Sequence, residues 1–494
     1  MNDQGFSGMR DGGLVPAVTA APFPFAARIT PHHASRPERR LELTGRDPAT
    51  GANVTHSFEL AGQEQGDYLD LFEKVATAYG TRLPRNRSSA RSPSFAASYR
   101  VLLDHNLSPD IWYGYGDPAV VHVPARTGRE EAWYYLLATS NDAPDAFPIL
   151  RSRTLTDWEL SGFVFPRGRK PAWAEDGLNT SDYWAPEMHV VGGQFLVCFA
   201  ARERGGALAI GLARASQPTG PFVAEDAPLI RGGVIDPHLF VDPAGRTYLF
   251  WKEDANDVWP SLLSALLHEH ADLAGALFTS PEDQRTACLA LTLWPWVRSL
   301  EPMERFLAQQ VLIEAVVSDF AGFRRRLTSL LNSPVPDAVR TAVGNTLGAM
   351  RTPIYAQELD PKGRCLIGNR VVVLENDRDW EAHLIEGIWV VQHADRFYLF
   401  YSGNDFSTPE YGTGVAVALS PLGPYRKMER PLLRSTATWA GPGHPSVAPG
   451  PDGEPWLFFH AFFPGQAGYK RFRALLAAPI GFDRDGVTLR WGAP

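Results

Sequence analysis

Cysteine, long apolar runs and an excess of positive charge are all scarce in this chain. Its 494 residues include three cysteines, Cys198, Cys288 and Cys365, too few and too scattered for a disulfide framework or a structural zinc site. No apolar run approaches the roughly 18 residues of a membrane-spanning helix. Lys and Arg number 47 against 55 Asp and Glu, a net charge of −8. We therefore expect no membrane span and no nucleic-acid partner.

The beginning of the chain also lacks the pattern of a secretion signal. Residues 1–13 have no basic n-region, and the next apolar stretch is interrupted by Pro16, Pro22 and Pro24. This favours a cytoplasmic location. The composition, 44% hydrophobic and 21% charged, is typical of a folded protein with a large core.

One pattern occurs five times: a small or acidic residue, in most copies a Pro, a short apolar strand, a turn, and an aromatic-rich strand. The copies begin at Asp117, Ala185, Asp236, Glu386 and His444, and a third apolar strand follows in each. Each unit is too short to bury a face alone, and radial stacking of the units would bury them all. The repeats therefore predict an all-β fold, a five-bladed β-propeller.

The third copy is interrupted by helical sequence. The strand pattern stops after Asn256 and resumes at Thr352, and Ser280-Pro281 has the form of an N-cap followed by Pro in the first turn. We expect a helical insertion over 257–349 in blade three. The propeller would then comprise residues 99–256 and 350–494.

Residues 1–98 are predicted to form a small N-terminal extension. Residues 1–30 indicate a flexible leader, 40–44 and 54–60 a hairpin, 68–79 a helix, and the Arg/Ser-rich run 85–94 a linker. The residues of this extension indicate no function.

Three copies of the pattern begin with a carboxylate: Asp117, Asp236 and Glu386. The first strand of each propeller blade lines the central channel, so these side chains should meet at its mouth. A single Asp-Pro at a strand start is commonly a turn. Three acids brought together destabilise one another, unless the reaction needs one carboxyl protonated and another ionised. Glycoside hydrolysis has that requirement.

The same motifs make the sequence similar to glycoside hydrolase family 43, which includes arabinanases, arabinofuranosidases and β-xylosidases. The resemblance runs from about residue 100 to the C-terminus, apart from the insertion. One departure is Gly387-Ile388, where the family often has Gly-Pro. The matching segments are 116–118, 183–187, 235–242, 245–248, 385–387, 401–404, 411–415, 443–445 and Arg473.

The resemblance implies roles for individual residues. Asp117 would be the general base, Glu386 the general acid, and Asp236 the acid that orients Glu386 and raises its pKa, in a reaction that inverts the anomeric configuration. Arg473 resembles the arginine near the sugar, its alternative being a structural salt bridge. His444 resembles the channel histidine that in many members lies near a calcium ion or a water cluster, its alternative being a buried histidine bonded to the backbone. The chemistry itself would require no cofactor.

Further residues are predicted to contact the carbohydrate substrate. They are aromatic residues beside the first acid and the second copy, together with polar residues of the matching motifs. The set comprises Trp112, Tyr113, Tyr115, Trp184, Glu187, Asn404 and Arg473.

The insertion would occupy the connection between the second and third strands of blade three. That connection should lie at the channel mouth, so we expect residues 257–349 to overhang it as a wall or lid that favours short substrates. A surface for homo-oligomer formation is the rival interpretation. Trp259, Trp294 and Trp296 fit a core better than a sugar-stacking surface.

The resulting hypothesis is an inverting glycosidase that acts on α-L-arabinofuranosyl or β-xylosyl linkages of short oligosaccharides or glycosides. Two alternatives stay open at this point. One is a sugar-transferring or phosphorolytic enzyme on a related five-bladed propeller. The other is a non-catalytic carbohydrate-binding or scaffold propeller.

Overall fold

The computed structural model describes most of the chain from residue 99 onward and parts of the N-terminal region. The residues described are 25–30, 39–46, 53–60, 71–72, 74–75 and 99–490, except 126–130, 179–180 and 301. The predicted linker 85–94 and most of the predicted leader therefore lie outside the described residues. The chain divides into two compact units, unit 1 (Met1–Pro84 and Pro260–Thr346) and unit 2 (Arg85–Trp259 and Leu347–Pro494).

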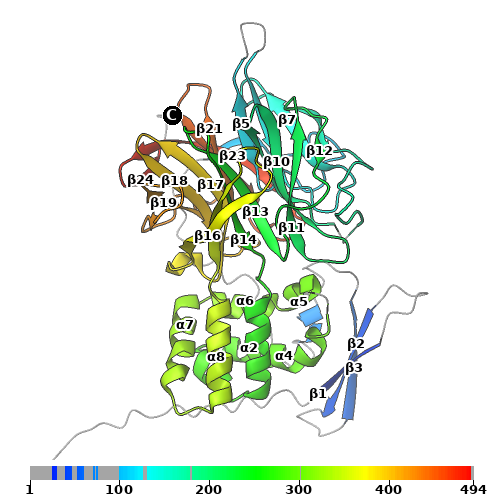
Figure 1. Ribbon diagram of the computed structural model, residues 1–494. Coiled ribbons are helices and arrows are strands. Elements are labelled where there is room, and N and C mark those ends of the chain that lie inside the picture. The colour runs from blue at the N-terminus through cyan, green and yellow to red at the C-terminus, as the bar shows by residue number, and fades with distance from the viewer. Residues whose placement is uncertain are drawn as a thin grey trace, which may run out of the picture. The chain divides into compact units, whose positions relative to one another are not determined.

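In its described residues, unit 2 contains five antiparallel sheets, each built from consecutive strands (Figure 1). The prediction of an all-β fold with repeated antiparallel units is thereby confirmed. The strands are β5 (Ala119–Val123), β6 (Trp133–Leu137), β7 (Ala146–Ser152) and β8 (Glu159–Phe165); β9 (Trp184–Val191), β10 (Gln194–Arg202), β11 (Leu208–Ala215) and β12 (Val223–Ala224); β13 (Val234–Val241), β14 (Thr247–Glu253), β15 (Pro353–Leu359) and β16 (Leu366–Glu375); β17 (Ile385–His393), β18 (Arg396–Gly403), β19 (Gly412–Ala418) and β20 (Arg426–Lys427); β21 (Ala440–Pro449), β22 (Pro455–Phe462), β23 (Ala474–Asp483) and β24 (Gly486–Leu489).

Local sequence explains why these strands form. Apolar and aromatic runs such as Phe195–Phe199 suit a strand buried on both faces. Tight turns join them: Gly192 and Gly193, between β9 and β10, have φ of 58° and 79°. A two-residue hairpin turn needs this left-handed backbone, and glycine adopts it without strain.

A strand from the start of unit 2 completes the last sheet. β4 (Arg100–Leu103) pairs antiparallel with β23, with Leu103 opposite Leu475. The sequence pattern did not indicate this pairing. It joins the two ends of unit 2 in one sheet.

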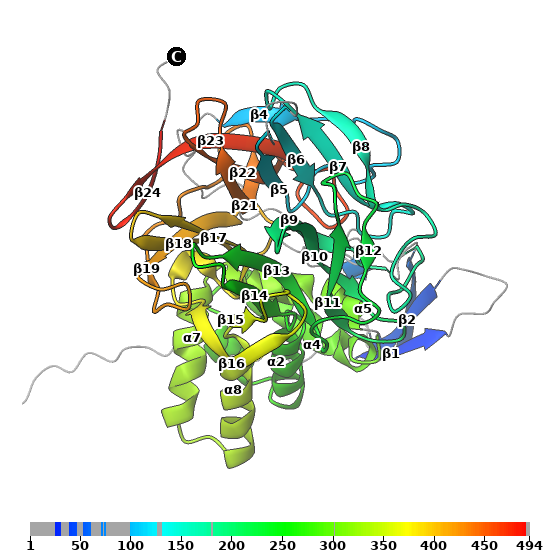
Figure 2. The ribbon, with the colours of Figure 1, turned by 45° about the horizontal axis from the view of Figure 1, so that its top comes forward.

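The first strands of the five sheets contact one another in cyclic order. β5 packs on β9, β9 on β13, β13 on β17, β17 on β21, and β21 on β5. Figure 2 shows these strands gathered at the middle of unit 2, with later strands such as β8, β16 and β24 farther out. In the described residues, a hydrophobic cluster also lies between each neighbouring pair of sheets. The core of unit 2 is thus spread over five sheet interfaces.

Helices occupy the connection between β14 and β15, which are themselves hydrogen-bonded neighbours. α4 begins as its sequence indicates, because the Ser280 hydroxyl accepts a hydrogen bond from the backbone N–H of Asp283 at 3.0 Å. None of the helices that the structure describes is both long and apolar enough to cross a membrane. The helices are α2 (Val258–Glu269), α3 (Leu273–Leu277), α4 (Pro281–Val297), α5 (Pro302–Ala308), α6 (Gln310–Val317), α7 (Phe320–Ser329), the 3₁₀ helix η2 (Leu330–Asn332) and α8 (Asp337–Ala349), with the 3₁₀ helix η3 (Asp379–Glu381) in unit 2.

Unit 1 combines most of these helices with the N-terminal region. β2 (Arg39–Arg46) and β3 (Asn53–Leu60) form the predicted hairpin, and β1 (Phe25–Thr30) adds to it, so residues 25–30 are a strand and not part of a leader. Leu71, Phe72 and Val75 are buried in one cluster with residues of α4 and α6. The N-terminal region therefore shares a core with the helices, because its apolar stripe is too small to form its own.

Candidate active site

In each of the five sheets, a left-handed backbone position lies at a corresponding place at or near the start of the first strand. These positions are Asp117, Ala185, Asp236, Gly387 and His444, with φ between 45° and 61°. The pairing register of β9, β13, β17 and β21 shifts there, as at a β-bulge. Strained backbone of this kind is concentrated at functional sites.

Glu386 is displaced by one residue from the position expected for it. The strained position of the fourth sheet is Gly387, so Glu386 is not equivalent to Asp117 and Asp236, as the repeat alignment had placed it. The left-handed backbone at 387 favours glycine, and a Cβ there would also be tightly packed, 3.1 Å from the His444 Cα.

Asp117 is surrounded by positive and donor groups. Its Oδ1 lies 2.8 Å from an Arg473 guanidinium nitrogen and 3.2 Å from Nδ1 of His444. Its Oδ2 accepts a hydrogen bond from the Thr139 hydroxyl. The Asp117 backbone N–H donates to Nδ1 of His460 at 3.1 Å.

These neighbours determine the charge of Asp117. Burial acts to raise its pKa, but the charges of Arg473 and His444 outweigh burial and hold the pKa well below its usual range. Burial likewise acts to lower the pKa of His444, and the charge of Asp117 outweighs it and raises the pKa to about 9. Asp117 is therefore a carboxylate at neutral pH, paired with two cations.

The backbone beside Asp117 is shaped to admit Arg473. A Cβ on Gly116 would lie 1.8 Å from Cζ of the guanidinium, so the arginine occupies the space that any other residue at 116 would fill. The Arg473 carbonyl also accepts the backbone N–H of Tyr115 at 2.8 Å. Arg473 thus forms the salt bridge considered for it, and its partner is the predicted general base.

The surroundings of Glu386 differ from those of Asp117, although the two side chains are buried to a similar extent. Its Oε1 accepts a hydrogen bond from the Tyr411 hydroxyl at 3.0 Å, and its Oε2 lies 3.7 Å from Nζ of Lys252. Burial raises the pKa of Glu386 to about 7; Lys252 opposes this rise and Asp236 adds to it. A large fraction of Glu386 is therefore protonated at neutral pH.

Asp236 contacts the turn that follows Glu386. Its Oδ2 accepts the backbone N–H of Gly387 at 2.8 Å, and its charge helps to keep Glu386 protonated. The orienting role that the sequence resemblance implied for Asp236 stays a prediction.

Side chains of the fourth and fifth sheets join the two carboxyls. The ring of Tyr411, which binds Glu386, stacks on His460 with centroids 5.9 Å apart, and His460 binds the backbone of Asp117. His444 interacts electrostatically with Asp117, Asp236 and Glu386. The three predicted acids therefore converge on one place, at the strained ends of three different sheets.

The calcium ion that the resemblance implied near His444 stays a prediction. Nδ1 of His444 lies 3.2 Å from Oδ1 of Asp117, and the His444 backbone N–H donates to the Ser402 hydroxyl at 2.7 Å. His444 is thus a cationic partner of Asp117, and the proposals below involve no metal ion.

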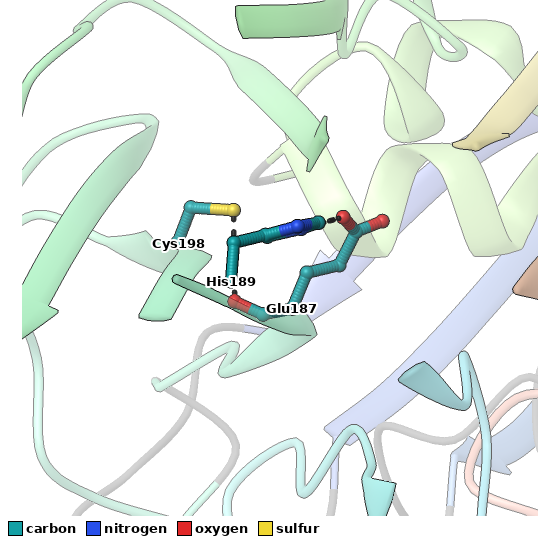
Figure 3. Close-up of side chains that lie close together, drawn as sticks. All are labelled: Glu187, His189 and Cys198. Carbon is teal, nitrogen blue, oxygen red and sulfur yellow. Dashed lines mark hydrogen bonds and ion pairs between the residues drawn. The ribbon is translucent and has the colours of Figure 1, made fainter. Parts of the chain in front are cut away.

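Glu187, His189 and Cys198 form a separate buried group whose ligand atoms lie within 4.8 Å of one another (Figure 3). Oε2 of Glu187 is shared by Nε2 of His189 at 2.8 Å and Nδ1 of His238 at 2.7 Å. The Cys198 thiol donates to the Pro237 carbonyl, and burial raises its pKa well above the usual range. Because the structure satisfies these groups with protein partners, they act as a hydrogen-bonded link between the second and third sheets. Glu187, predicted to bind substrate, belongs to this link.

The other predicted substrate-binding residues divide into two kinds. Tyr115 is fully buried and its hydroxyl is bonded to the backbone of His105 and Leu107. Asn404, at φ 73°, uses its side chain on the backbone of Trp380 and Asp405. The prediction is wrong for these two, because packing and turn geometry consume both side chains.

The indole rings are more accessible. Trp112 is 36% exposed, and Trp184 is half-buried with its Nε1 donating to Oδ1 of Asn141 at 2.9 Å. Trp259, Trp294 and Trp296 are buried, as core residues should be.

Sequence reasoning assigned no role in the site to Thr139, Lys252, Tyr411 and His460, although Tyr411 lies in the matching segment 411–415. Lys252 and His460 also left a signal, since each is a buried ionisable residue within a mainly apolar strand. Thr139 follows the end of β6, where its hydroxyl reaches Asp117 and also accepts the backbone N–H of Ala185 at 2.8 Å. Nothing in the local sequence marks it.

Comparison with known proteins identifies the family. The family model described as glycosyl hydrolases family 43 matches residues 111–287 and 343–488. The xylosidase/arabinosidase 43A of Humicola insolens is 35% identical over 68 residues, which are 14% of this chain and 21% of that protein. The chain thus matches only about a fifth of the length of that curated relative.

Two solved structures are similar to this chain. A thermostable family-43 glycoside hydrolase superposes with a TM-score of 0.51 at 24% identity, over 77% of this chain and 95% of that one. An endo-1,4-beta-xylanase from Bacteroides thetaiotaomicron has a TM-score of 0.49 at 18% identity, over 77% and 96% of the two chains. With a family model that covers more than half of its length, this chain belongs to glycosyl hydrolases family 43, and the prediction of an enzyme of the glycosidase class is confirmed.

Proposed function

We propose that unit 2 is a five-bladed β-propeller whose hub is the active site of an inverting glycoside hydrolase. The cyclic contacts of the first strands, the clusters between neighbouring sheets and the closing strand β4 support the propeller. The convergence of Asp117, Asp236 and Glu386 supports the site.

The opposite protonation states of two carboxyls carry this proposal. Asp117 is held ionised by Arg473 and His444, whereas the pKa of Glu386 is raised to about 7. An inverting glycosidase needs one carboxylate to accept a proton from water and one carboxylic acid to donate a proton to the leaving oxygen.

In the proposed reaction, Asp117 removes a proton from a water molecule as its oxygen bonds to the anomeric carbon. Glu386 transfers its proton to the glycosidic oxygen as the bond from that oxygen to the anomeric carbon breaks. The products are the leaving alcohol and a sugar of inverted configuration, with Asp117 protonated and Glu386 ionised. Proton exchange with solvent restores both groups.

The proposed substrates are α-L-arabinofuranosyl or β-xylosyl linkages of short oligosaccharides or glycosides. The name of the Humicola insolens relative supports this class, although the match to it is short. Trp112, which is 36% exposed, and Trp184 offer aromatic faces on which a sugar ring could pack.

The test is hydrolysis of a panel of nitrophenyl arabinofuranosides, xylosides and galactosides, with ¹H NMR to identify the first anomer released. We expect hydrolysis of an arabinofuranoside or a xyloside, with the inverted anomer appearing first. A retained anomer would contradict the mechanism, and turnover of galactosides alone would contradict the substrate class.

A further inference from the structure

Lys252 is a lysine in an unusual place. It lies in β14 and its side chain is fully buried. Lysine is almost never fully buried unless it is paired, because removing an ammonium group from water is costly. The buried run Tyr248–Trp251 directly before it offers packing partners, but these do not satisfy a charge.

Asn256 and Glu386 are direct partners of the ammonium, and the carboxyls of Asp254 and Asp405 also interact with its charge. Nζ donates to Oδ1 of Asn256 at 3.0 Å and lies 3.7 Å from Oε2 of Glu386. Asn256 lies three residues after the end of β14. The strand and the Asn256 side chain together hold Nζ of Lys252 beside Oε2 of Glu386. The other oxygen of Glu386 is held by Tyr411, so both oxygens have a fixed partner.

We propose that Lys252 is a positioning residue that fixes Oε2 of Glu386 and stabilises the carboxylate that remains after Glu386 has given up its proton. This inference rests on the proposed role of Glu386 as the general acid.

The groups around Glu386 favour opposite states of its carboxyl. Asp236 and burial favour the neutral acid that must exist before the reaction. Lys252, with His444 and Tyr411, favours the anion that exists after it. An acid whose anion is stabilised transfers its proton more readily, and the benefit is greatest when the leaving alcohol is a weak acid that needs protonation. Lys252 would therefore matter more for a natural glycoside than for a nitrophenyl glycoside.

The experiment compares Lys252→Met with Lys252→Gln. Both remove the charge, and the glutamine can still donate a hydrogen bond to Asn256. In both variants, the alkaline limb of the kcat/KM profile should move up by roughly one pH unit, since a cation within about 4–6 Å shifts a carboxyl by at least that much. For an unactivated oligosaccharide, kcat/KM should fall about tenfold or more, and for a nitrophenyl glycoside about threefold or less.

Lys170→Met is the matched control. Lys170 is also buried, and its Nζ donates to the Ala143 carbonyl at 3.0 Å and to Asp176 at 2.8 Å. Its loss should leave the alkaline limb unchanged. An unmoved or lowered limb in both Lys252 variants, or an equal loss of activity on both classes of substrate, would overturn the inference.

A measurement without substrate separates this inference from the proposed function. The carboxyl of Glu386 can be titrated by ¹³C NMR in protein labelled with carboxyl-¹³C glutamate, and the missing resonance of Glu386→Gln assigns it. An upward shift of the Glu386 pKa in Lys252→Met supports the electrostatic role even if no panel glycoside is hydrolysed. An unchanged titration refutes it even if the wild type is an active glycosidase.

Discussion

The surroundings of Asp117 and those of Glu386 form two contrasting halves of one site. On the Asp117 side, Arg473 and His444 bring positive charge to within 2.8 and 3.2 Å of one carboxylate oxygen. On the Glu386 side, the cation Lys252 is farther away, at 3.7 Å, and the charge of Asp236 opposes it. Both carboxyls are largely removed from solvent, so burial alone would raise the pKa of both.

The difference therefore comes from partners and not from depth. Asp117 and Glu386 are similarly buried, but their pKa values are shifted in opposite directions. Asp117 lies close to two cations, whereas Glu386 lies near the anion of Asp236 and a more distant cation. Environments that push two pKa values apart are the means by which one site supplies both a base and an acid. The predictions below test whether each half depends on its own partners.

The largest expected effect comes from removing either carboxyl. Asp117→Asn should lower kcat/KM by about 10³-fold or more on every substrate, because water then has no base. Glu386→Gln should lower it as strongly on oligosaccharides but far less on nitrophenyl glycosides, whose leaving groups need little protonation. Steady-state kinetics on both substrate classes measure this, with circular dichroism to confirm folding. If Glu386→Gln lowered kcat/KM equally for oligosaccharides and nitrophenyl glycosides, Glu386 would not be the general acid.

Removal of the Arg473 charge should have the next largest effect. In Arg473→Met, burial of Asp117 is opposed only by the weaker effects of His444 and His460, so the pKa of Asp117 rises and the acid limb of kcat/KM should move up by about one to three pH units. Activity at pH 5 should then fall more than activity at pH 7.

Arg214→Met is a suitable control for Arg473→Met. Arg214 is paired with Glu225 at 2.7 Å and donates to the Gly363 carbonyl at 2.8 Å. Neither of these partners is among the groups described around Asp117. Its loss should leave the acid limb where it is in the wild type. A similar movement in both variants would indicate a general loss of stability.

Asp236→Asn should act in the opposite direction, on the other half of the site. Asparagine still accepts the Gly387 N–H but carries no charge, so the pKa of Glu386 should fall. The alkaline limb of kcat/KM should then move down by about one pH unit, because the proton of Glu386 is lost at lower pH. A pH profile between 5 and 9 measures this shift. An upward shift would show that Asp236 does not raise the pKa of Glu386.

The sequence predicted the sheets and the convergence of the acids, because equivalent positions in a repeated strand pattern occupy equivalent places in the fold even when their contacts are unknown. Five copies of one strand pattern predicted the sheets, and the acids at their starts predicted a convergence of Asp117, Asp236 and Glu386. The buried polar residues Lys252 and His460 stood out only as exceptions within apolar strands.

The partners could not be predicted in the same way. Arg473 is 356 positions from Asp117 along the chain, and strands of different sheets bring the two together. Glu386 lies one residue before the left-handed position of its sheet, Gly387, where the strand pairing shifts. The repeated strand pattern does not show this offset, because the pattern gives residue types and not backbone angles. Tyr115 and Asn404 failed as binding residues for a related reason, since aromatic and amide side chains serve packing and turns as readily as sugars.

The smallest expected effect is that of Tyr411→Phe, which sharpens the contrast on the Glu386 side. The Tyr411 hydroxyl donates to Oε1 of Glu386 at 3.0 Å and so favours the anion, as Lys252 does. Its loss should raise the pKa of Glu386 and move the alkaline limb up by about 0.5 to 1 pH unit, since such a bond contributes roughly 1 kcal/mol. Tyr398→Phe is the control, because Tyr398 is a buried tyrosine that donates to the Asp483 carbonyl at 2.6 Å. Tyr411→Phe and Asp236→Asn should thus move the same limb in opposite directions, and a shared direction would mean that both act through packing and not through charge.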